Sequence, residues 1–232
     1  MKLSIIIPVY NESRTVLQIL DKIEAQTKFN KQIIIVDDCS TDNSLEKIKT
    51  YHFKSEFLII SHKKNLGKGA CIKTAKTKIK GDLVLIQDAD LEYDPDDYKN
   101  LIYPILNNNF SVVYGSRVLE KSRYSKSNFT SKLRVFLNHI LTIFSNIINN
   151  QNLTDAHTCY KLFKKEIFNS LSLIENDFSF CPEVTTKIGN KKIPIKEVPI
   201  NYYGRDYKDG KKIKFIDGIK AIITIIKYKN IL

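Results

Sequence analysis

The sequence predicts an α/β fold with a mostly parallel, doubly wound sheet flanked by helices. Three observations support this prediction. Short apolar runs rich in β-branched residues alternate with amphipathic stretches through residues 3–114, and polar loops follow the ends of the runs. Such runs are typical of strands buried on both faces, and their alternation with helices favours β-α-β units. With 232 residues, 43% of them hydrophobic, the chain can also bury a substantial core.

The first half predicts five strands, each followed or preceded by a helix. The expected strands cover residues 3–9, 32–36, 57–60, 82–87 and 110–114, and the expected helices cover 12–27, 43–51, 70–79 and 96–108. We expect Ser40 or Thr41 to cap the second helix, because both residue types favour helix N-caps. Parallel sheets bind ligands at the carboxyl ends of their strands. The loops after Val36 and Gln87 are therefore the expected binding edge.

The second half is less regular. We expect helices over residues 132–148, 180–188 and 213–228, a short strand over 159–163, an extended segment over 193–202 and a Gly- and Lys-rich loop over 203–212. Pro194 and Pro199 favour the extended conformation of that segment. No repeat, low-complexity tract or shift in composition marks a linker. We therefore expect one domain over residues 1–232.

The charge of the chain favours an anionic partner. Thirty-seven Lys and Arg residues against 25 Asp and Glu give a formal net charge of +12, which suits nucleic acid, phosphate compounds or an acidic membrane surface without choosing among them. No apolar window reaches the roughly 20 residues of a membrane helix, and the run at 3–9 is too short for a secretory leader. We expect a cytoplasmic protein. Its four cysteines and four histidines show no metal-site spacing, so free thiols are expected.

The Asp88-Ala89-Asp90 string is the first candidate for chemistry. Two carboxylates that are two residues apart point the same way on an extended backbone. They provide oxygen ligands for Mg²⁺ or Mn²⁺, with diphosphate oxygens in other positions, and Glu92 is a candidate third ligand. A bound cation neutralises the charge that develops on a departing nucleoside diphosphate. A D-x-D string is common by chance, but its position after a buried strand favours this function.

Three further groups lie near the same predicted edge. Asp38 follows the second strand, where it can bind a ribose hydroxyl or a base edge. Residues 67–69, Gly-Lys-Gly, precede a helix and suit either a phosphate cradle or a plain tight turn. Arg117 follows the fifth strand, and arginine is well suited to bidentate phosphate contacts.

Taken together, these segments resemble glycosyltransferase family 2, in its dolichyl-phosphate mannosyltransferase or polyprenyl-phosphate glycosyltransferase branch. The matching strings run in the expected order over nearly the whole chain. They are IPVYNE at 7–12, VDDCSTD at 36–42, NLGKG at 65–69, QDADLE at 87–92, GSR at 115–117, TD at 154–155, TCYK at 158–161, PEV at 182–184, VPI at 198–200 and GKKI at 210–213. Each string alone is a weak signal, but the ordered set is specific.

The resemblance implies a GT-A fold, which is a Rossmann-like nucleotide-binding fold. It implies a nucleotide-sugar-binding half over residues 1–117 and an acceptor half over 118–232 that ends in an amphipathic helix. It also implies roles for individual side chains. These are base and ribose contacts by Pro8, Tyr10, Glu12 and Asp38, metal and diphosphate contacts by Asp88, Ala89, Asp90 and Glu92, acceptor-phosphate contacts by Arg117 and Arg134, and a diphosphate clamp by Arg205 and Lys211.

The expected activity is metal-dependent, inverting transfer of a hexose from a nucleotide-sugar to polyprenyl or dolichyl phosphate. The resemblance makes GDP-mannose and UDP-glucose the leading donors. Such an acceptor needs little activation, because a phosphate monoester is largely dianionic at neutral pH. The nearest alternative is transfer to a sugar hydroxyl in cell-surface polysaccharide synthesis, for which Asp155 or Glu183 is the candidate base.

Other classes have less support. A nucleotidyltransferase would need a signature for attack on an α-phosphate, and none is visible. A nucleic-acid-binding protein suits the charge but has no need of acids at two strand ends, so no nucleic-acid partner is expected. Peripheral contact with the inner face of the cytoplasmic membrane is a hypothesis for helices 132–148 and 213–228, with ordinary core packing as the alternative.

Overall fold

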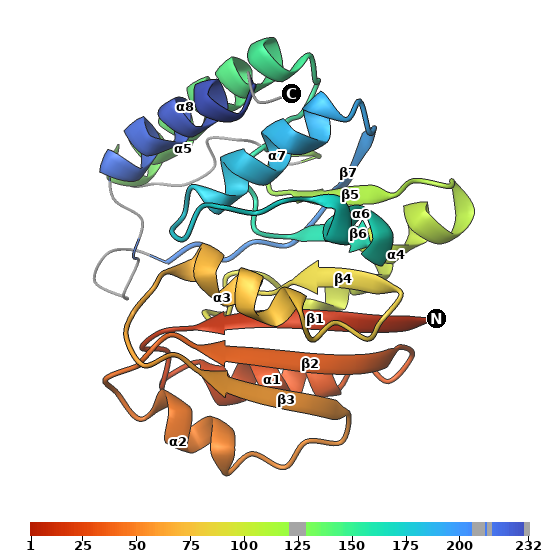
Figure 1. Cartoon of the computed structure of the whole chain (residues 1–232), viewed down its shortest axis with the longest axis vertical. Helices are drawn as coiled ribbons and strands as arrows, with labels where there is room; N and C mark the ends of the chain where they lie inside the picture. Colours follow the sequence, from red (N-terminus) through yellow and green to blue (C-terminus); the bar gives the residue numbers. More distant parts are fainter. Residues whose placement is uncertain (121–128, 206–211, 213–214, 230–232) are drawn as a thin grey trace.

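The structure is a computed structural model, and it describes residues 1–120, 129–205, 212 and 215–229, without the side chains of residues 129–134 and 215 (Figure 1). Seven strands form one sheet in the order β3-β2-β1-β4-β6-β5-β7. The strands are β1 Lys2–Val9, β2 Asn30–Asp37, β3 Glu56–Ser61, β4 Leu83–Ile86, β5 Val112–Ser116, β6 Lys161–Lys164 and β7 Ile195–Pro199. β6 pairs antiparallel with β4 and β5, and all other pairs are parallel. The expected α/β class with a mostly parallel sheet is confirmed.

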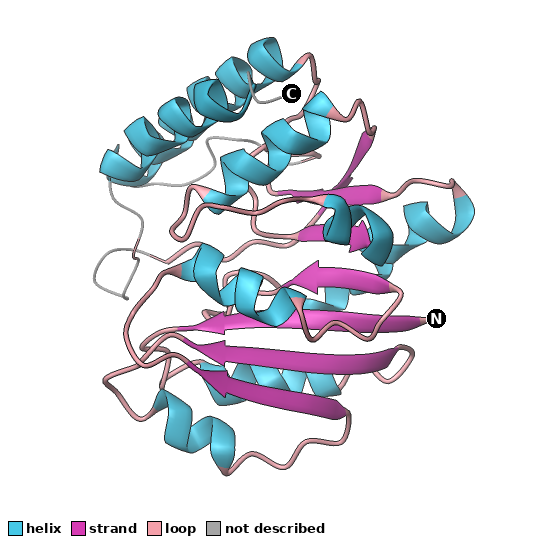
Figure 2. Cartoon of the chain, in the orientation of Figure 1, coloured by secondary structure: helices cyan, strands magenta, loops and turns pink. Residues whose placement is uncertain are grey.

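Helices cover both faces of this sheet (Figure 2). In the view of Figure 1, α3 lies in front of β1 and α1 lies behind β2. The helices are α1 Val16–Glu24, α2 Ser44–Lys49, α3 Lys68–Lys76, α4 Tyr98–Asn107 after the 3₁₀ turn η1 Pro95–Asp97, α5 Phe129–Asn149, α6 Lys165–Ser170, α7 Phe180–Asn190 and α8 Phe215–Lys229. Because both faces are covered, β1, β2 and β4 are almost completely buried.

Local bonding explains where the sequence-based boundaries differ. α1 begins at Val16 rather than near residue 12, because the carbonyl of Glu12 first accepts the amides of Thr15 and Val16 in a turn. The expected caps at Ser40 and Thr41 are wrong. α2 begins only at Ser44, and Ser40 and Thr41 instead bind the amide and side chain of Asn11. The two loops that follow β1 and β2 are thereby tied together at the binding edge.

Helices α5, α7 and α8 form a layer beside the β5-β7 end of the sheet (Figure 1). α5 and α8 run in the same direction. Gly218 of α8 lies close to Leu141 of α5. The C-terminal ends of both helices meet the C-terminal half of α7. There, Asn149 of α5 donates to Thr186, and Asn190 of α7 donates to the carbonyl of Tyr228 in α8. Within the described residues, no helix has the length and apolarity to cross a membrane.

The turn before α3 packs directly on the chain at residues 175–177. A Cβ on Gly69 would lie 2.4 Å from the carbonyl oxygen of Glu175. We therefore expect Gly69→Ala to lower the free energy of unfolding by about 1–3 kcal/mol, because the backbone has to shift to admit a methyl group. Gly218→Ala is the matched control, since its Cβ would meet only the Cδ1 of Leu141 at 3.7 Å. Alanine there should be neutral or stabilising by up to about 1 kcal/mol. Urea unfolding of both variants measures the difference, and equal stabilities would contradict the expected clash.

Candidate active site

The carboxyl ends of β1 and β4 bring four acidic residues to one edge of the sheet, as expected. Glu12 follows β1, and Asp88, Asp90 and Glu92 follow β4. Arg205 joins three of them through its guanidinium and its backbone amide. It donates to the Glu12 carboxylate at 3.0 and 3.2 Å and to Oδ2 of Asp90 at 3.0 Å, while the Arg205 amide donates to Glu92 at 2.6 Å. A segment near the end of the chain therefore completes a site that begins at the first strand.

The two acids of the D-x-D string have opposite electrostatic environments. Burial, followed by the nearby carboxylates of Asp88 and Glu92, raises the pKa of Asp90 to about 7. Burial also raises the pKa of Asp88, but the Lys68 ammonium, a hydrogen bond with Cys159 and the charge of Lys212 together hold that pKa below its usual range. Asp88 therefore stays ionised, whereas Asp90 lacks enough positive charge around it to favour its anion fully.

Lys68 is the counter-ion of Asp88. Its Nζ donates to Oδ1 of Asp88 at 2.5 Å and lies 3.0 Å from the sulfur of Cys159. The lysine begins α3, so the turn at residues 67–69 places a cation beside the D-x-D string. Burial disfavours the ammonium, but Asp88, with smaller contributions from Cys159 and Cys181, raises the pKa of Lys68 above its usual value. The lysine is therefore charged at neutral pH.

A second cation approaches the site from the same end of the chain as Arg205. Nζ of Lys212 donates to Glu12 at 2.6 Å and to the carbonyl oxygen of Tyr10, and it lies 5.6 Å from the centre of the Tyr10 ring. Lys211, the expected clamp residue, lies outside the described residues. The GKKI string at 210–213 contains both Lys211 and Lys212. The sequence alone therefore offered no reason to select Lys212 as the residue that contacts the site.

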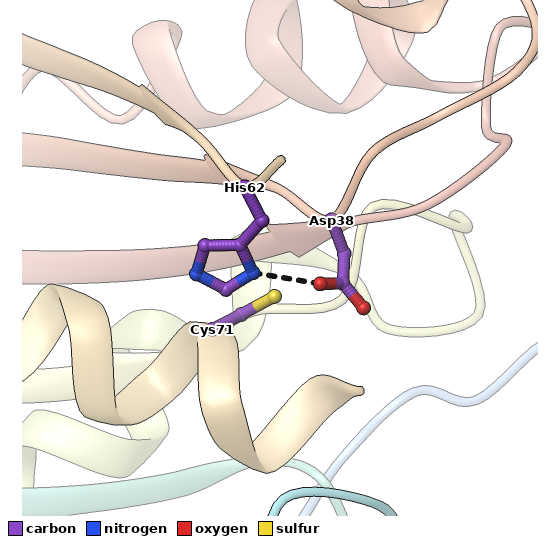
Figure 3. A group of neighbouring side chains, drawn as sticks. All are labelled: Asp38, His62 and Cys71. Atoms are coloured by element: carbon purple, nitrogen blue, oxygen red, sulfur yellow. Dashed lines mark hydrogen bonds and ion pairs between the residues drawn. The ribbon is translucent and has the colours of Figure 1, made fainter. Parts of the chain in front are cut away.

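Asp38 lies at the end of β2 in a hydrogen-bonded cluster (Figure 3). Its carboxylate accepts from the amides of Leu66 and Gly67 at 2.9 and 2.7 Å and contacts Nδ1 of His62 at 2.7 Å, and the sulfur of Cys71 is close by. Burial and then Asp38 raise the pKa of Cys71, so its thiol remains protonated. The cluster thus fixes the loop before α3 against the end of β2, and a base or ribose contact by Asp38 stays a prediction.

Arg117 lies beyond β5 and is paired with Asp155. Nε and Nη2 of Arg117 donate to the two carboxylate oxygens at 2.6 and 2.7 Å, and the guanidinium lies 5.1 Å from the centre of the Tyr202 ring. Tyr202 in turn donates to Glu92 at 2.8 Å. Tyr202 therefore connects Arg117 to Glu92, one of the four acidic residues at the edge of the sheet. Its expected contact with an acceptor phosphate remains a prediction.

The pair also determines what Asp155 can do. Burial raises the pKa of Asp155, but Arg117 outweighs it and lowers that pKa to about 2. The carboxylate is a weak base, because it holds a proton only in strong acid. Glu183, the other candidate base, is fully buried and accepts the amides of Ile174 and Glu175. The carboxylates of Asp155 and Glu183 are therefore both occupied by contacts within the folded chain.

We expect Asp155→Asn to lower the free energy of unfolding by about 3 kcal/mol, because it leaves the charge of Arg117 buried without a counter-ion. The folded-state pKa of Asp155 is depressed, so its stabilising contribution is complete above the unfolded pKa of about 3.9 and is lost as pH falls towards 2. The difference between wild type and variant should therefore shrink between pH 5 and pH 3. Urea unfolding at both pH values measures it. Asp82→Asn, at a largely exposed ion pair, should cost less than about 1 kcal/mol.

The donor set of the acidic edge fits a hard divalent cation. Asp88, Asp90 and Glu92 offer carboxylate oxygens, which are the ligands that Mg²⁺ and Mn²⁺ prefer. Burial, and then the crowding of these acids, raises the pKa of Asp90, and a positive charge among them relieves the repulsion. Arg205 supplies one such charge to Asp90. The residues present therefore suit a metal ion at this edge.

The structure brings most of the predicted residues together and does not describe the side chains of two of them. Arg134 belongs to α5, but its side chain, like residue Lys211, lies outside what the structure describes. Pro8 pairs in register with Val36 near the end of β1, two residues before Tyr10. Sequence analysis missed Lys68 as the partner of Asp88 and His62 as the partner of Asp38. The sequence signal nearest to Lys68 was the Gly-Lys-Gly turn, which did not indicate that the lysine pairs with Asp88.

Comparison with known proteins agrees with this geometry. Residues 4–172 match the family described as glycosyl transferase family 2. The chain belongs to that family. It is therefore a glycosyltransferase, and the D-x-D string after β4 has the position expected from the sequence resemblance.

Two proteins with similar sequences are named for transfer to dolichyl phosphate. Dolichyl-phosphate beta-glucosyltransferase ALG5C of Trichomonas vaginalis is 29% identical over 96% of this chain and 69% of its own. UDP-N-acetylglucosamine--dolichyl-phosphate N-acetylglucosaminyltransferase of Methanococcus voltae is 26% identical over 97% of this chain and 95% of its own. These two relatives transfer different sugars, so family membership alone does not select the donor.

A solved structure confirms the expected GT-A fold. Glucosyl-3-phosphoglycerate synthase from Mycobacterium tuberculosis, in complex with Mn²⁺, uridine diphosphate and phosphoglyceric acid, superposes with a TM-score of 0.72. The comparison covers 99% of this chain and 78% of the synthase, at 15% sequence identity. At this identity the similarity establishes the shared fold and leaves the substrates open.

Proposed function

We propose that this family 2 enzyme transfers a hexose from a nucleotide-sugar to a polyprenyl or dolichyl phosphate and inverts the anomeric centre. One observation carries the choice of acceptor. Both candidate carboxylate bases are engaged, Asp155 with Arg117 and Glu183 with two backbone amides. An acceptor that arrives already ionised needs no such base, and the lipid phosphates named for the relatives meet that condition.

The reaction is a single displacement. An oxygen of the acceptor phosphate attacks the anomeric carbon and forms the new C–O bond. The bond from that carbon to the diphosphate breaks, and the nucleoside diphosphate leaves with the electron pair. Attack opposite the leaving group inverts the anomeric centre. With a second pKa near 6, a phosphate monoester is mostly dianionic at neutral pH. The nucleophile therefore carries its charge before it enters the site.

The cationic residues of the site suit the two phosphate groups. Arg205 and Lys212 lie over the acidic edge, where they can bind donor diphosphate as charge develops in the transition state. Asp155 occupies Nε and Nη2 of Arg117 and leaves Nη1 for an acceptor phosphate. Asp88, Asp90 and Glu92 would hold a Mg²⁺ or Mn²⁺ ion, which would supply further charge neutralisation for the leaving diphosphate. GDP-mannose and UDP-glucose are the proposed donors.

Donor turnover tests this function. The assay contains purified chain, Mg²⁺ or Mn²⁺, a panel of nucleotide-sugars and a short, water-soluble polyprenyl phosphate, and it follows release of nucleoside diphosphate. Metal-dependent release that requires the lipid phosphate is the expected result, and NMR of the product gives the anomeric configuration. Turnover with a sugar acceptor instead of the lipid phosphate would move the assignment to a hydroxyl acceptor. Failure to bind any nucleotide-sugar would contradict the proposed activity altogether.

A further inference from the structure

Gln87, the residue before the D-x-D string, carries a fully buried side-chain amide that is hydrogen-bonded on both sides. Its Nε2 donates to the carbonyl oxygen of Asp88 at 3.0 Å, and its Oε1 accepts the hydroxyls of Tyr98 at 2.9 Å and Tyr160 at 2.6 Å. These partners fix the orientation of the amide. The Asp88 carbonyl can only accept a hydrogen bond, so the NH₂ group of Gln87 has to face it, and both hydroxyls then meet the oxygen.

The Asp88 carbonyl lies just beyond the hydrogen-bonded part of β4. β4 pairs with β1 as far as Ile86 opposite Ile6, and the backbone amide of Gln87 makes the next bond, to the Ile6 carbonyl at 2.9 Å. The D-x-D string therefore begins where the sheet stops orienting the backbone. The Gln87 side chain supplies the next hydrogen bond, and it ties the first peptide of the string to two side chains of the core.

Packing alone does not explain a buried amide at this position. Gln87, Tyr98 and Tyr160 are each 0% exposed, and the residues of β4 that precede Gln87 are all apolar and buried. A methionine would fill a similar space without a polar group that has to be satisfied. A buried polar group whose bonds are all made specifies one orientation of the groups around it. The group that Gln87 orients is the backbone of Asp88.

A second contact holds the carboxylate of the same residue. Oδ1 of Asp88 accepts from Nζ of Lys68 at 2.5 Å, and that Nζ also lies 3.0 Å from the sulfur of Cys159. Cys159 and Tyr160 are neighbours in the TCYK string at 158–161, directly before β6. Tyr160 thus reaches the main chain of Asp88 through Gln87, and Cys159 reaches its carboxylate through Lys68. The TCYK string therefore supports both the main chain and the side chain of Asp88.

We propose that Gln87 is the positioning residue of the D-x-D string, which holds the Asp88 peptide so that the carboxylates of Asp88 and Asp90 are in place before a divalent cation binds. This inference deepens the proposed function, because it rests on the metal role of the string. Tyr98 and Tyr160 belong to the same device, since they fix the Gln87 amide. Side chains that orient the ligands of a metal ion typically contribute about 10- to 100-fold to metal affinity.

Calorimetric titration with Mn²⁺, in the presence of UDP or GDP, tests this role without an acceptor. Gln87→Met removes the amide and keeps the length of the side chain. We expect it to lower the affinity for Mn²⁺ by about 10- to 100-fold. Raising the Mn²⁺ concentration should then restore turnover of the variant, which a loss of folded enzyme would not allow.

Gln32→Met is the matched control. Gln32 is 2% exposed, its Nε2 donates to the carbonyl of Lys78 at 3.0 Å, and its Oε1 accepts from Ser4 at 2.6 Å. It lies near the start of β2, at the edge of the sheet opposite the site. We expect both methionine variants to lower the urea midpoint of unfolding, because each loses a buried amide with its bonds made. Only Gln87→Met should weaken Mn²⁺ binding.

A second variant leaves Gln87 in place. Tyr98→Phe with Tyr160→Phe removes both hydroxyls from Oε1, so the amide is no longer held and the Mn²⁺ affinity should fall as well. Tyr114→Phe is its control, because it removes a buried tyrosine hydroxyl on β5 that has no contact with Gln87. The double variant also decides the question if Gln87→Met does not fold.

Four outcomes are distinguishable. Wild-type affinity for Mn²⁺ in Gln87→Met and in the double tyrosine variant would overturn the proposal. An equal fall in Gln87→Met and Gln32→Met would also overturn it, because the effect would then come from lost stability. Mn²⁺ binding that depends on Gln87, without turnover on the lipid phosphate, would retain the role of Gln87 and reject the acceptor. Wild-type binding no tighter than that of Asp90→Ala would reject the metal site and the role of Gln87 together.

Discussion

Asp90→Ala is expected to lower turnover by about 10³-fold or more while leaving the fold intact. Asp90 is the second acid of the D-x-D string, and its carboxylate lies among Asp88, Glu92 and Arg205. Its removal takes away a metal and diphosphate contact, and single electrostatic groups of this kind contribute about 10²–10³ in rate before any loss of metal is counted. The folded state loses no stability from the change, because one member of a crowded acidic group is gone.

Two measurements check this prediction. Nucleoside diphosphate release gives the rate, and calorimetric titration with Mn²⁺ in the presence of nucleoside diphosphate gives the metal affinity, which should fall as well. Asp96→Ala is the matched control, since Asp96 is an exposed acid on the following turn whose side chain accepts from Gln26 and whose backbone amide donates to Asp94. Full activity of Asp90→Ala would contradict the metal role of the string.

Arg205→Gln is expected to have two opposite effects. Turnover should fall by about 10²-fold or more, because the guanidinium no longer stabilises charge on the donor diphosphate. The affinity for Mn²⁺ in the absence of donor should rise, because Arg205 no longer competes for Asp90 and Glu92. A residue that only supports the fold would lower both quantities together. The opposite signs therefore identify Arg205 as a cation that shares its carboxylates with the metal.

Two control variants accompany Arg205→Gln: one keeps the positive charge at residue 205, and the other removes a positive charge far from the site. Arg205→Lys keeps the charge but not the two-pronged contact with Glu12, so an intermediate turnover is expected. Lys22→Gln removes an exposed ion pair with Asp94 and should change neither quantity. A fall in Mn²⁺ affinity for Arg205→Gln would contradict the competition, and unchanged turnover would contradict the diphosphate contact.

Local sequence patterns predicted the helices and strands of the first half of the chain more accurately than those of the second half. The apolar runs of β1, β2 and β4 were visible because each strand is buried on both faces and reads as a continuous apolar stretch. β6 is only four residues long and α6 only six. Their conformations depend on pairing between β4 and β5 and on packing, so local periodicity gives a weak signal for β6 and missed α6. The antiparallel direction of β6 has no local signal at all.

The sequence by itself determined the α/β class, the acidic edge after β4 and membership of the glycosyltransferase family. These follow from apolar periodicity and from short ordered strings, which involve residues near one another in the chain. Only the tertiary structure decided which charges meet. Glu12 and Arg205 are 193 residues apart, and Arg117 meets Asp155 across 38. Such pairings depend on how distant elements pack, because burial penalises any charge without a partner, and no local pattern records that choice.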